Sequence, residues 1–282
     1  MTPAECAPVV SAAPMPPCND PHARLVLGIF VLTPSAERRL KADLALQVVR
    51  AEAIEPWQAH NNQLQHVWSA DGREVVVKTY YQDDRHRLDR EFTALVFLRA
   101  HGILELPTPL LRDNEHNFAV YSYEPGATGP GSALTSSAVT RIANFAAKLH
   151  DIAPDLPGAA HFRTSVPATF SFADMVRGTR ARLAQFIAHA ALMEDRLLAH
   201  TNWQTKIESL IREALRGAED TPIPRTGWRF STADLAPHNI LVTDDDQICV
   251  LDLEYSGWDD PADARRRLSD GRNLDFSRRR VR

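Results

Sequence analysis

Three residues near the C-terminal end of the chain have types and spacing that suit chemistry on phosphates. Asn239 follows Asp234 by five positions, and Asp252 follows Asn239 by thirteen, at the end of an apolar run. A carboxylate beside a hydroxyl can accept its proton, and carboxylate and amide oxygens are ligands that Mg²⁺ prefers. Phosphoryl transfer needs few protein groups beyond such a carboxylate and such metal ligands, because its catalysis consists mainly of positioning and charge stabilisation.

Two short strands joined by a turn are predicted to bring these residues together. Residues 240–242 and 248–251 are apolar and β-branched, and the acidic stretch 244–247 between them predicts the turn. Such a hairpin returns the chain to its start, so Asp252 would arrive near Asn239. The alternative is a surface hairpin with ordinary turn residues, because Asp and Asn are common in turns.

The strings around these residues resemble the aminoglycoside phosphotransferase/choline kinase family of small-molecule kinases. The family's usual strings are H-G-D-L-H-x-x-N and I-D-[FW]-E. The matching residues are Asp234, Leu235, Asn239, Asp252 and Glu254. Thr232 and Ala233 replace His-Gly, which removes a histidine that supports the loop in the family. The resemblance implies that Asp234 is the catalytic base and that Asn239 and Asp252 bind Mg²⁺.

A lysine on a strand and a glutamate on the following helix form the other half of the pattern. Residues 73–80 predict a strand with Lys78 near its end. Residues 87–102 predict a helix, because apolar positions recur at three-to-four spacing before a terminal glycine. The stretch R-E-F-T-A-L, which contains Glu91, resembles the family's R-E-x-x-x-L. This implies a Lys78–Glu91 ion pair that holds the lysine on the ATP phosphates; the alternative is two solvated surface charges.

Two further stretches resemble the nucleotide-binding parts of the family. Asn61 and Asn62 open the string N-N-Q-L-Q, similar to the family's N-N-x-V-Y, and asparagine tolerates the tight turn that glycines make in protein kinases. Residues 118–126 predict a strand that runs into Pro-Gly, like the family's hinge between lobes. The alternative is an ordinary strand end. The resemblance implies that this hinge binds adenine near Ser122, Tyr123 and Glu124.

The resemblance also implies an α+β, bilobal protein-kinase-like fold, with a small β-rich N-lobe and a mainly helical C-lobe. We assign residues 35–125 to the N-lobe, with a lead-in helix over Ser35–Ala53, an antiparallel sheet and the Glu91 helix. Residues 126–263 form the C-lobe with the catalytic hairpin. Its amphipathic patterns predict long helices over Phe172–Ala190 and Leu192–Leu215.

Both ends depart from the family pattern. Residues 1–34 open with a proline-rich stretch that offers little to pack, and we expect them to be disordered. Residues 264–282 hold eight Arg and two acidic residues, without a helical apolar period, where the family has further C-terminal helices. Because those helices wall the acceptor site in the family, one alternative is an inactive, truncated kinase-like remnant that at most binds nucleotide. A basic nucleic-acid tail is a second alternative, which the acidic remainder of the chain disfavours.

The composition is that of an ordinary globular protein and gives no sign of a membrane-spanning or disulfide-rich protein. The chain of 282 residues is 44% hydrophobic and 24% charged, as in ordinary globular proteins. The longest apolar run, Leu25–Leu32, is far shorter than the ~20 residues needed to span a membrane. Three cysteines form no disulfide framework or metal-ligand spacing, which favours a reducing cytoplasm.

The net charge of the chain bears on which small molecule accepts the phosphate. The net charge of −4 leaves −10 for residues 1–263, which suits a cationic acceptor such as an amino sugar or amino alcohol, although it also serves solubility. The resemblance to the family implies an ATP- and Mg²⁺-dependent transfer of the γ-phosphate to a hydroxyl of a small molecule. The sequence predicts no oligomeric state.

Overall fold

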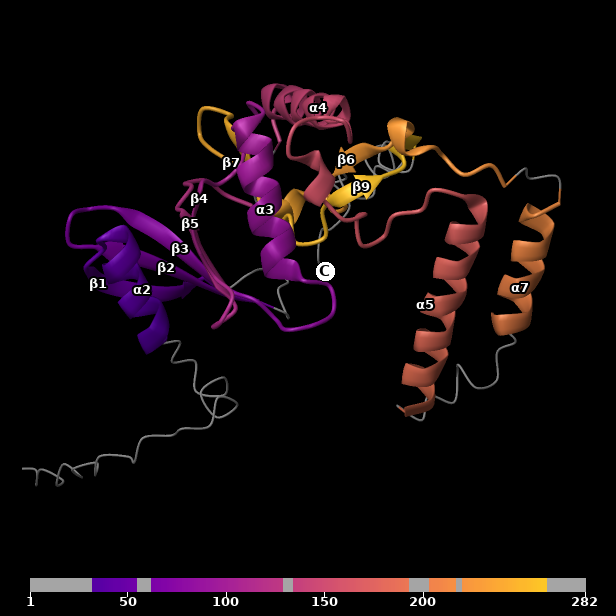
Figure 1. The fold of residues 1–282 in the computed structure, drawn as a ribbon, viewed down its shortest axis with the longest axis horizontal. Helices are drawn as coiled ribbons and strands as arrows, with labels where there is room; N and C mark the ends of the chain where they lie inside the picture. The colour runs from indigo at the N-terminus through magenta and orange to yellow at the C-terminus, as the bar shows by residue number, and fades with distance from the viewer. Residues whose placement is uncertain (1–31, 55–61, 129–133, 193–202, 217–219, 263–282) are drawn as a thin grey trace, which may run out of the picture.

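The computed structural model describes residues 32–54, 62–128, 134–192, 203–216 and 220–262. Figure 1 shows an antiparallel sheet with helix α2 at one end, a helical body with short strands at the other, and helix α3 between them. No helix in these described ranges is both long and apolar enough to cross a membrane. The expectations for Asn61, for residues 1–31 and for the basic tail fall outside the described ranges.

The sheet has five antiparallel strands in the order β1-β2-β3-β5-β4. The strands are β1 (Val48–Ile54), β2 (Gln63–Ser69), β3 (Glu74–Thr79), β4 (Pro109–Asp113) and β5 (Phe118–Ser122). On the central strand β3, Lys78 lies opposite Leu64 of β2 and Ala119 of β5. Helix α2 (Pro34–Leu44) buries Leu40 in a core shared with the sheet residues Val67 and Phe118.

The lead-in helix predicted over Ser35–Ala53 is shorter than expected. Helix α2 begins after Thr33, whose hydroxyl accepts a hydrogen bond from the amide of Ala36, and it ends at Ala45 in a left-handed conformation. The residues from Val48 onward form β1, which pairs with β2. The prediction was wrong there because pairing with a neighbouring strand outweighs the helical propensity of the Ala and Glu residues in this segment.

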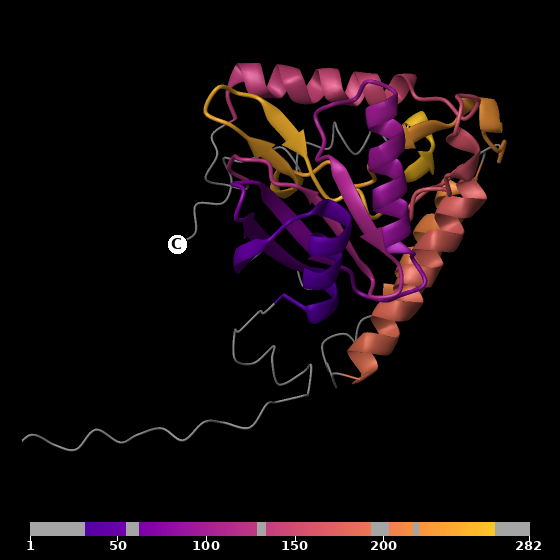
Figure 2. The ribbon, with the colours of Figure 1, turned by 60° about the vertical axis from the view of Figure 1, so that its left-hand side comes forward.

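Helix α3 (Arg87–Ala100) joins the two bodies through one continuous core. Its buried residues Leu95 and Leu98 share that core with Phe145 of α4 (Ser136–Asp151) and with Trp258. The C-terminal body also contains β6 (Arg229–Ser231) paired with β9 (Gly257–Asp259), and the hairpin of β7 (Ile240–Val242) and β8 (Ile248–Val250). Figure 2 shows α4 running across one end of the molecule, over the hairpin and α3.

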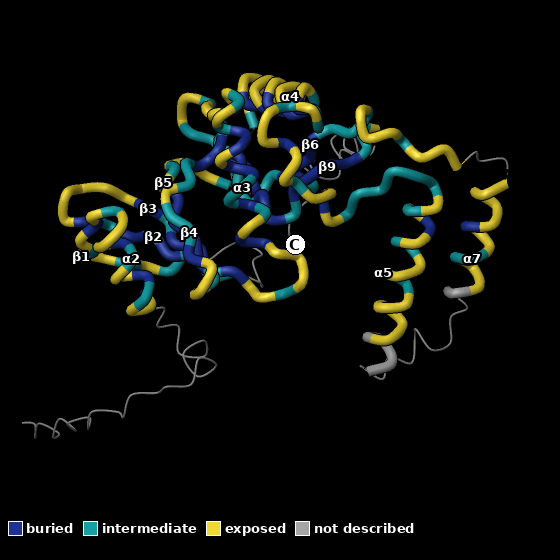
Figure 3. The backbone as a smooth tube through the Cα atoms, viewed as in Figure 1, coloured by how far each residue is buried: buried dark blue, intermediate teal, exposed yellow. Residues whose placement is uncertain are grey.

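Helices α5 (Phe172–Leu192) and α7 (Trp203–Ala214) project from this body side by side. A two-pronged ion pair joins them, with Arg180 Nε and Nη2 at 2.9 and 2.8 Å from the carboxylate of Glu208. Their described side chains are mostly exposed, as Figure 3 shows, and Val176 is the buried exception on the described part of α5. The two helices predicted in this region are present, with residues 193–202 between them outside the described part.

Candidate active site

The β7–β8 hairpin brings Asn239 and Asp252 together, as its spacing predicts. Leu251 donates its backbone N–H to the carbonyl of Asn239 at 2.8 Å, so Asp252 lies next to that residue. The buried side chain of Asn239 donates from Nδ2 to the backbone carbonyl of Asp234 at 3.1 Å. This bond fixes the amide group, so that its oxygen is the end available to a cation.

The backbone on both sides of the hairpin is held in an uncommon conformation. Ala233 has φ of 66° and Asp252 has φ of 60°, in the left-handed region that costs non-glycine residues free energy. Ala233 stands where the family string has glycine, and this φ gives the reason for a glycine there.

Lys78 pairs with two carboxylates from different parts of the chain. Its Nζ lies 2.7 Å from Glu91 Oε2 and 2.6 Å from Asp252 Oδ1, so the Lys78–Glu91 ion pair expected from the sequence is present. Glu91 also accepts hydrogen bonds from the Tyr80 hydroxyl at 2.7 Å and from the Leu253 amide at 3.3 Å. The helix that carries Glu91 is therefore tied both to the sheet and to the chain following Asp252.

Lys78 and Glu91 form an ion pair at low exposure within this cluster. Burial alone would lower the pKa of Lys78, but Asp252, Glu91 and Glu254 raise that pKa well above its ordinary value. Burial raises the pKa of Glu91, and the ammonium group of Lys78 opposes that rise. Charged forms persist in such a site only when paired, so each member of the cluster depends on the others.

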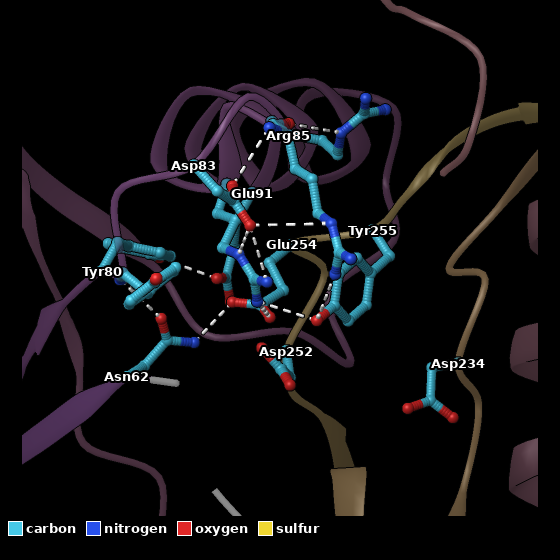
Figure 4. A network of polar contacts seen from close by, with 12 residues as sticks. Asn62, Tyr80, Asp83, Arg85, Glu91, Asp234, Asp252, Glu254 and Tyr255 are labelled. Carbon is cyan, nitrogen blue, oxygen red and sulfur yellow. Dashed lines mark hydrogen bonds and ion pairs between the residues drawn. The ribbon is translucent and has the colours of Figure 1, made fainter. Parts of the chain in front are cut away.

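Glu254 has contacts that sequence reasoning did not anticipate. It matches the family string, and its buried carboxylate accepts hydrogen bonds from the side chains of Asn62 and Arg87. Asn62 also uses its side-chain oxygen to accept from the amide of Tyr81 at 3.1 Å. Figure 4 shows Asn62, Glu254 and Asp252 around the same space, with Asp234 set apart from them.

Lys78 is the cation that faces the grouped carboxylates at this point, so Asn239 and Asp252 are the residues whose oxygen atoms fit a hard divalent cation. Among the described residues, the carboxylates of Glu91, Asp252 and Glu254 gather within 4.8 Å of one another. Lys78 Nζ already faces all three, at 2.7, 2.6 and 3.8 Å. Asp252, whose side chain is 33% exposed, and Asn239 both line the adjoining cavity and offer it oxygen ligands.

A cavity of about 540 Å³ separates the sheet from the hairpin. Leu64 and Val76 line it from the sheet, and Leu241 and Leu251 line it from the hairpin side. Lys78, Asn239 and Asp252 also line it, and so do the hinge residues Ser122, Tyr123 and Glu124. Apolar walls with a few grouped polar side chains are the usual features of a small-molecule site, and the volume lies in the usual range.

The hinge is fastened to the sheet by its own residues. Ser122 donates its backbone N–H to the Thr108 carbonyl at 2.9 Å, and Tyr123 donates to the Glu74 carbonyl at 3.4 Å. The ring of Tyr123 stacks on His66 with centroids 3.8 Å apart. The amides of Ser122 and Tyr123 already donate hydrogen bonds within the protein. The expected contacts with adenine are therefore restricted to the other backbone groups of the hinge.

Asp234 lies beside this cavity rather than among the residues that line it. Its side chain is 39% exposed, and Oδ2 is 3.7 Å from Nε2 of His238. The interaction with Asp234 raises the pKa of His238 above its ordinary value. His238 was not identified from the sequence; the available signal was its place four residues after Asp234 on the same loop.

Comparison with known proteins agrees with this geometry. Residues 54–262 match the sequence model of the phosphotransferase enzyme family. The chain belongs to this family. Among curated proteins no match is found.

Solved structures of phosphotransferases share the fold. Spectinomycin phosphotransferase in complex with ADP and spectinomycin has a TM-score of 0.55 at 13% identity, over 82% of this chain and 71% of that one. Macrolide 2'-phosphotransferase MphH from Brachybacterium faecium has a TM-score of 0.51 at 22% identity, over 79% and 72%. The streptomycin–ATP ternary complex of APH(2")-IIa has a TM-score of 0.54 at 14% identity, over 83% and 74%. The bilobal, kinase-like α+β fold expected from the sequence is confirmed.

Proposed function

We propose that this phosphotransferase-family protein transfers the γ-phosphate of ATP to a hydroxyl of a small molecule in a Mg²⁺-dependent reaction. The observation that carries the proposal is the meeting of Lys78, Asn239 and Asp252 at one cavity, with Asp234 beside it. Lysine, amide and carboxylate are the groups that phosphoryl transfer requires around a nucleotide. Family membership supports the coarser part of the proposal, a small-molecule phosphotransferase.

Each residue has a distinct part in this scheme. Asn239 and Asp252 would hold Mg²⁺, which when bound supplies positive charge to the phosphate oxygens. Lys78, which its ion pair with Glu91 positions, would donate hydrogen bonds to the phosphates. Asp234, at the open side of the loop, accepts the proton of the acceptor hydroxyl or orients that hydroxyl.

The acceptor is proposed to be a small molecule with a free hydroxyl, and a cationic one suits the acidic remainder of the chain. ADP release from purified protein with Mg²⁺-ATP, measured across amino sugars, amino alcohols and neutral sugars, tests this. Release stimulated by one class identifies the acceptor. Nucleotide binding without release for any acceptor would instead favour the nucleotide-binding remnant.

The substitution Asp234→Ala tests the chemistry itself. We expect it to lower kcat by about 10²- to 10⁴-fold, the usual contribution of a general base. The affinity for Mg²⁺-ATP should stay close to that of the wild type, because Asp234 lies outside the residues lining the cavity. Asp244→Ala, on the exposed hairpin turn, is the matched control and should leave kcat unchanged. Loss of nucleotide affinity in Asp234→Ala with the fold intact would contradict the assignment.

A further inference from the structure

Two arginines in the first turns of α3 reach across to the chain that follows Asp252. Arg87 donates from Nη1 to the carboxylate of Glu254. Arg90 donates from Nη1 to the backbone carbonyls of Thr164 and Ser256, each at 2.7 Å. We call Arg87, Arg90 and Glu254 the interlobe latch, because they join the helix carrying Glu91 to the C-terminal body.

The ion pair of Arg87 and Glu254 within the latch is buried, and both of its charges are satisfied. The side chains of Arg87 and Glu254 are each 3% exposed. Arg87 also donates to Asp83 Oδ2 from Nε and Nη2, both at 2.9 Å, so one guanidinium serves two carboxylates. A buried ion pair adds little net stability compared with apolar packing, but removing one partner leaves an uncompensated charge. Such a pair is effective at holding one arrangement in place.

The latch connects three parts that face the cavity. Glu254 follows Asp252 by two positions and accepts a hydrogen bond from Asn62, the residue immediately before β2. Glu91 follows Arg87 by one helical turn, so the pairing of Arg87 fixes where Glu91 meets Lys78. Movement of α3 away from the C-terminal body would separate Arg87 from Glu254 and Arg90 from the carbonyls of Thr164 and Ser256 at the same time.

We infer that the interlobe latch assembles the nucleotide site before nucleotide binds, with Glu254 as a positioning residue for Asn62 and α3. Its carboxylate is engaged by Arg87 and Asn62, and the cation it faces is Lys78 at 3.8 Å. Glu254 thus acts through its neighbours instead of as a ligand of Mg²⁺. The inference rests on the proposed function and deepens it.

A reciprocal exchange tests the role of Glu254. Glu254→Gln removes the charge and Asn62→Asp places two carboxylates in contact, so each single change should raise the KM for Mg²⁺-ATP. We expect about 10- to 100-fold, the usual effect of losing a partner that orients a binding group. The double variant Asn62→Asp/Glu254→Gln removes the repulsion between the two carboxylates and restores one donor facing one charged acceptor, but it leaves Arg87 without the charge of Glu254. Its KM for Mg²⁺-ATP should therefore be lower than that of Asn62→Asp, and a KM no lower than that of Asn62→Asp would overturn the inference.

The arginine side of the latch has a matched control. Arg112 of β4 forms an ion pair at 2.6 Å with Asp89, which lies on α3 like Arg87 but is exposed. Arg87→Met should raise the KM for Mg²⁺-ATP, whereas Arg112→Met should not. A purely structural role would lower the apparent kcat through loss of folded protein and leave both KM values unchanged, so an unchanged KM in Arg87→Met and Glu254→Gln would also overturn the inference.

Hydrogen exchange separates the latch from the proposed activity. In protein without nucleotide, backbone amides of residues 88–95 should exchange faster in Glu254→Gln and Arg87→Met than in the wild type and in Arg112→Met. This measurement needs no acceptor or turnover, so it tests the latch even if the proposed phosphotransfer fails. Unchanged exchange in both latch variants would reject it.

Discussion

At the scale of single residues, Lys78 is a cation that three carboxylates of the site share. Lys78→Met would leave Glu91, Asp252 and Glu254 close together without their shared cation. Breaking a buried pair in this way usually destabilises a protein by about 3–5 kcal/mol. We expect a loss of that order in the free energy of unfolding at pH 8, measured by urea denaturation.

Lys148→Met is the control for this change, because Lys148 pairs with Glu105 on the surface and such pairs contribute about 0–1 kcal/mol.

The defect of Lys78→Met should also depend on pH. The pKa of Glu91 is raised in the folded protein, so the folded state binds its proton more readily than the unfolded state does. Lys78 opposes this rise, so Lys78→Met should raise the pKa of Glu91 further and let the variant take up this proton at a higher pH than the wild type. The defect should therefore shrink as pH falls from 8 to 5; a defect independent of pH would contradict this account.

The site residues that were predicted from the sequence lie in short motifs, in which the residues are close together along the chain. Asp234, Asn239 and Asp252 lie on one loop and hairpin, and Lys78 and Glu91 lie on adjacent elements. The bond between Arg87 and Glu254 joins positions 167 residues apart and leaves no local pattern. Such contacts depend on how α3 docks, which no spacing within either segment reveals.

At the scale of elements, the hairpin and α3 were predictable, whereas β1 was not. The hairpin has turn residues between two apolar runs, and α3 has a strong helical period. Strand β1 lacks such a signal, and its structure follows from pairing with β2. The conformation of such a strand can be predicted only after the position of its partner strand is known.

Gly257 at the start of β9 is an element-scale requirement for close packing. A Cβ at this position would lie 2.4 Å from the Arg163 carbonyl oxygen and 2.7 Å from the Ser165 amide. Both contacts are backbone atoms that hydrogen-bond to Trp258, so neither can move freely. Gly257→Ala should lower the free energy of unfolding by about 1–3 kcal/mol, the usual cost of overpacking.

Gly178→Ala should have the opposite effect. Gly178 lies within helix α5, and the nearest atom to a new Cβ is the flexible end of Arg182 at 3.8 Å. Alanine should therefore stabilise the helix by about 0.5–1 kcal/mol. Urea midpoints that move in opposite directions for the two variants would support this account, and a destabilised Gly178→Ala would contradict it.

At the scale of the whole molecule, the order of motifs along the chain was enough to predict two lobes. It could not predict how α5 and α7 project from the body, because their amphipathic patterns show only that each has an apolar face. The nucleotide side of the site is built from the sheet, α3 and the hairpin, which one continuous core holds together. A ligand bound in the cavity therefore contacts both bodies at once.

Binding in that cavity should stabilise the whole chain. At a nucleotide concentration of 100 times Kd, mass action adds about 2.7 kcal/mol to the free energy of unfolding, so Mg²⁺-ATP should raise the Tm clearly. Asp252→Asn should abolish the difference in Tm between ATP with Mg²⁺ and ATP with EDTA, because this variant loses the carboxylate that we propose as a ligand of the cation. Asp234→Ala should keep that difference, since we propose that Asp234 acts on the acceptor. Each variant is compared with its own nucleotide-free protein, which removes any effect of the substitution on the Lys78 cluster. An equal Mg²⁺-dependent rise in Asp252→Asn and the wild type would show that the cation is held elsewhere.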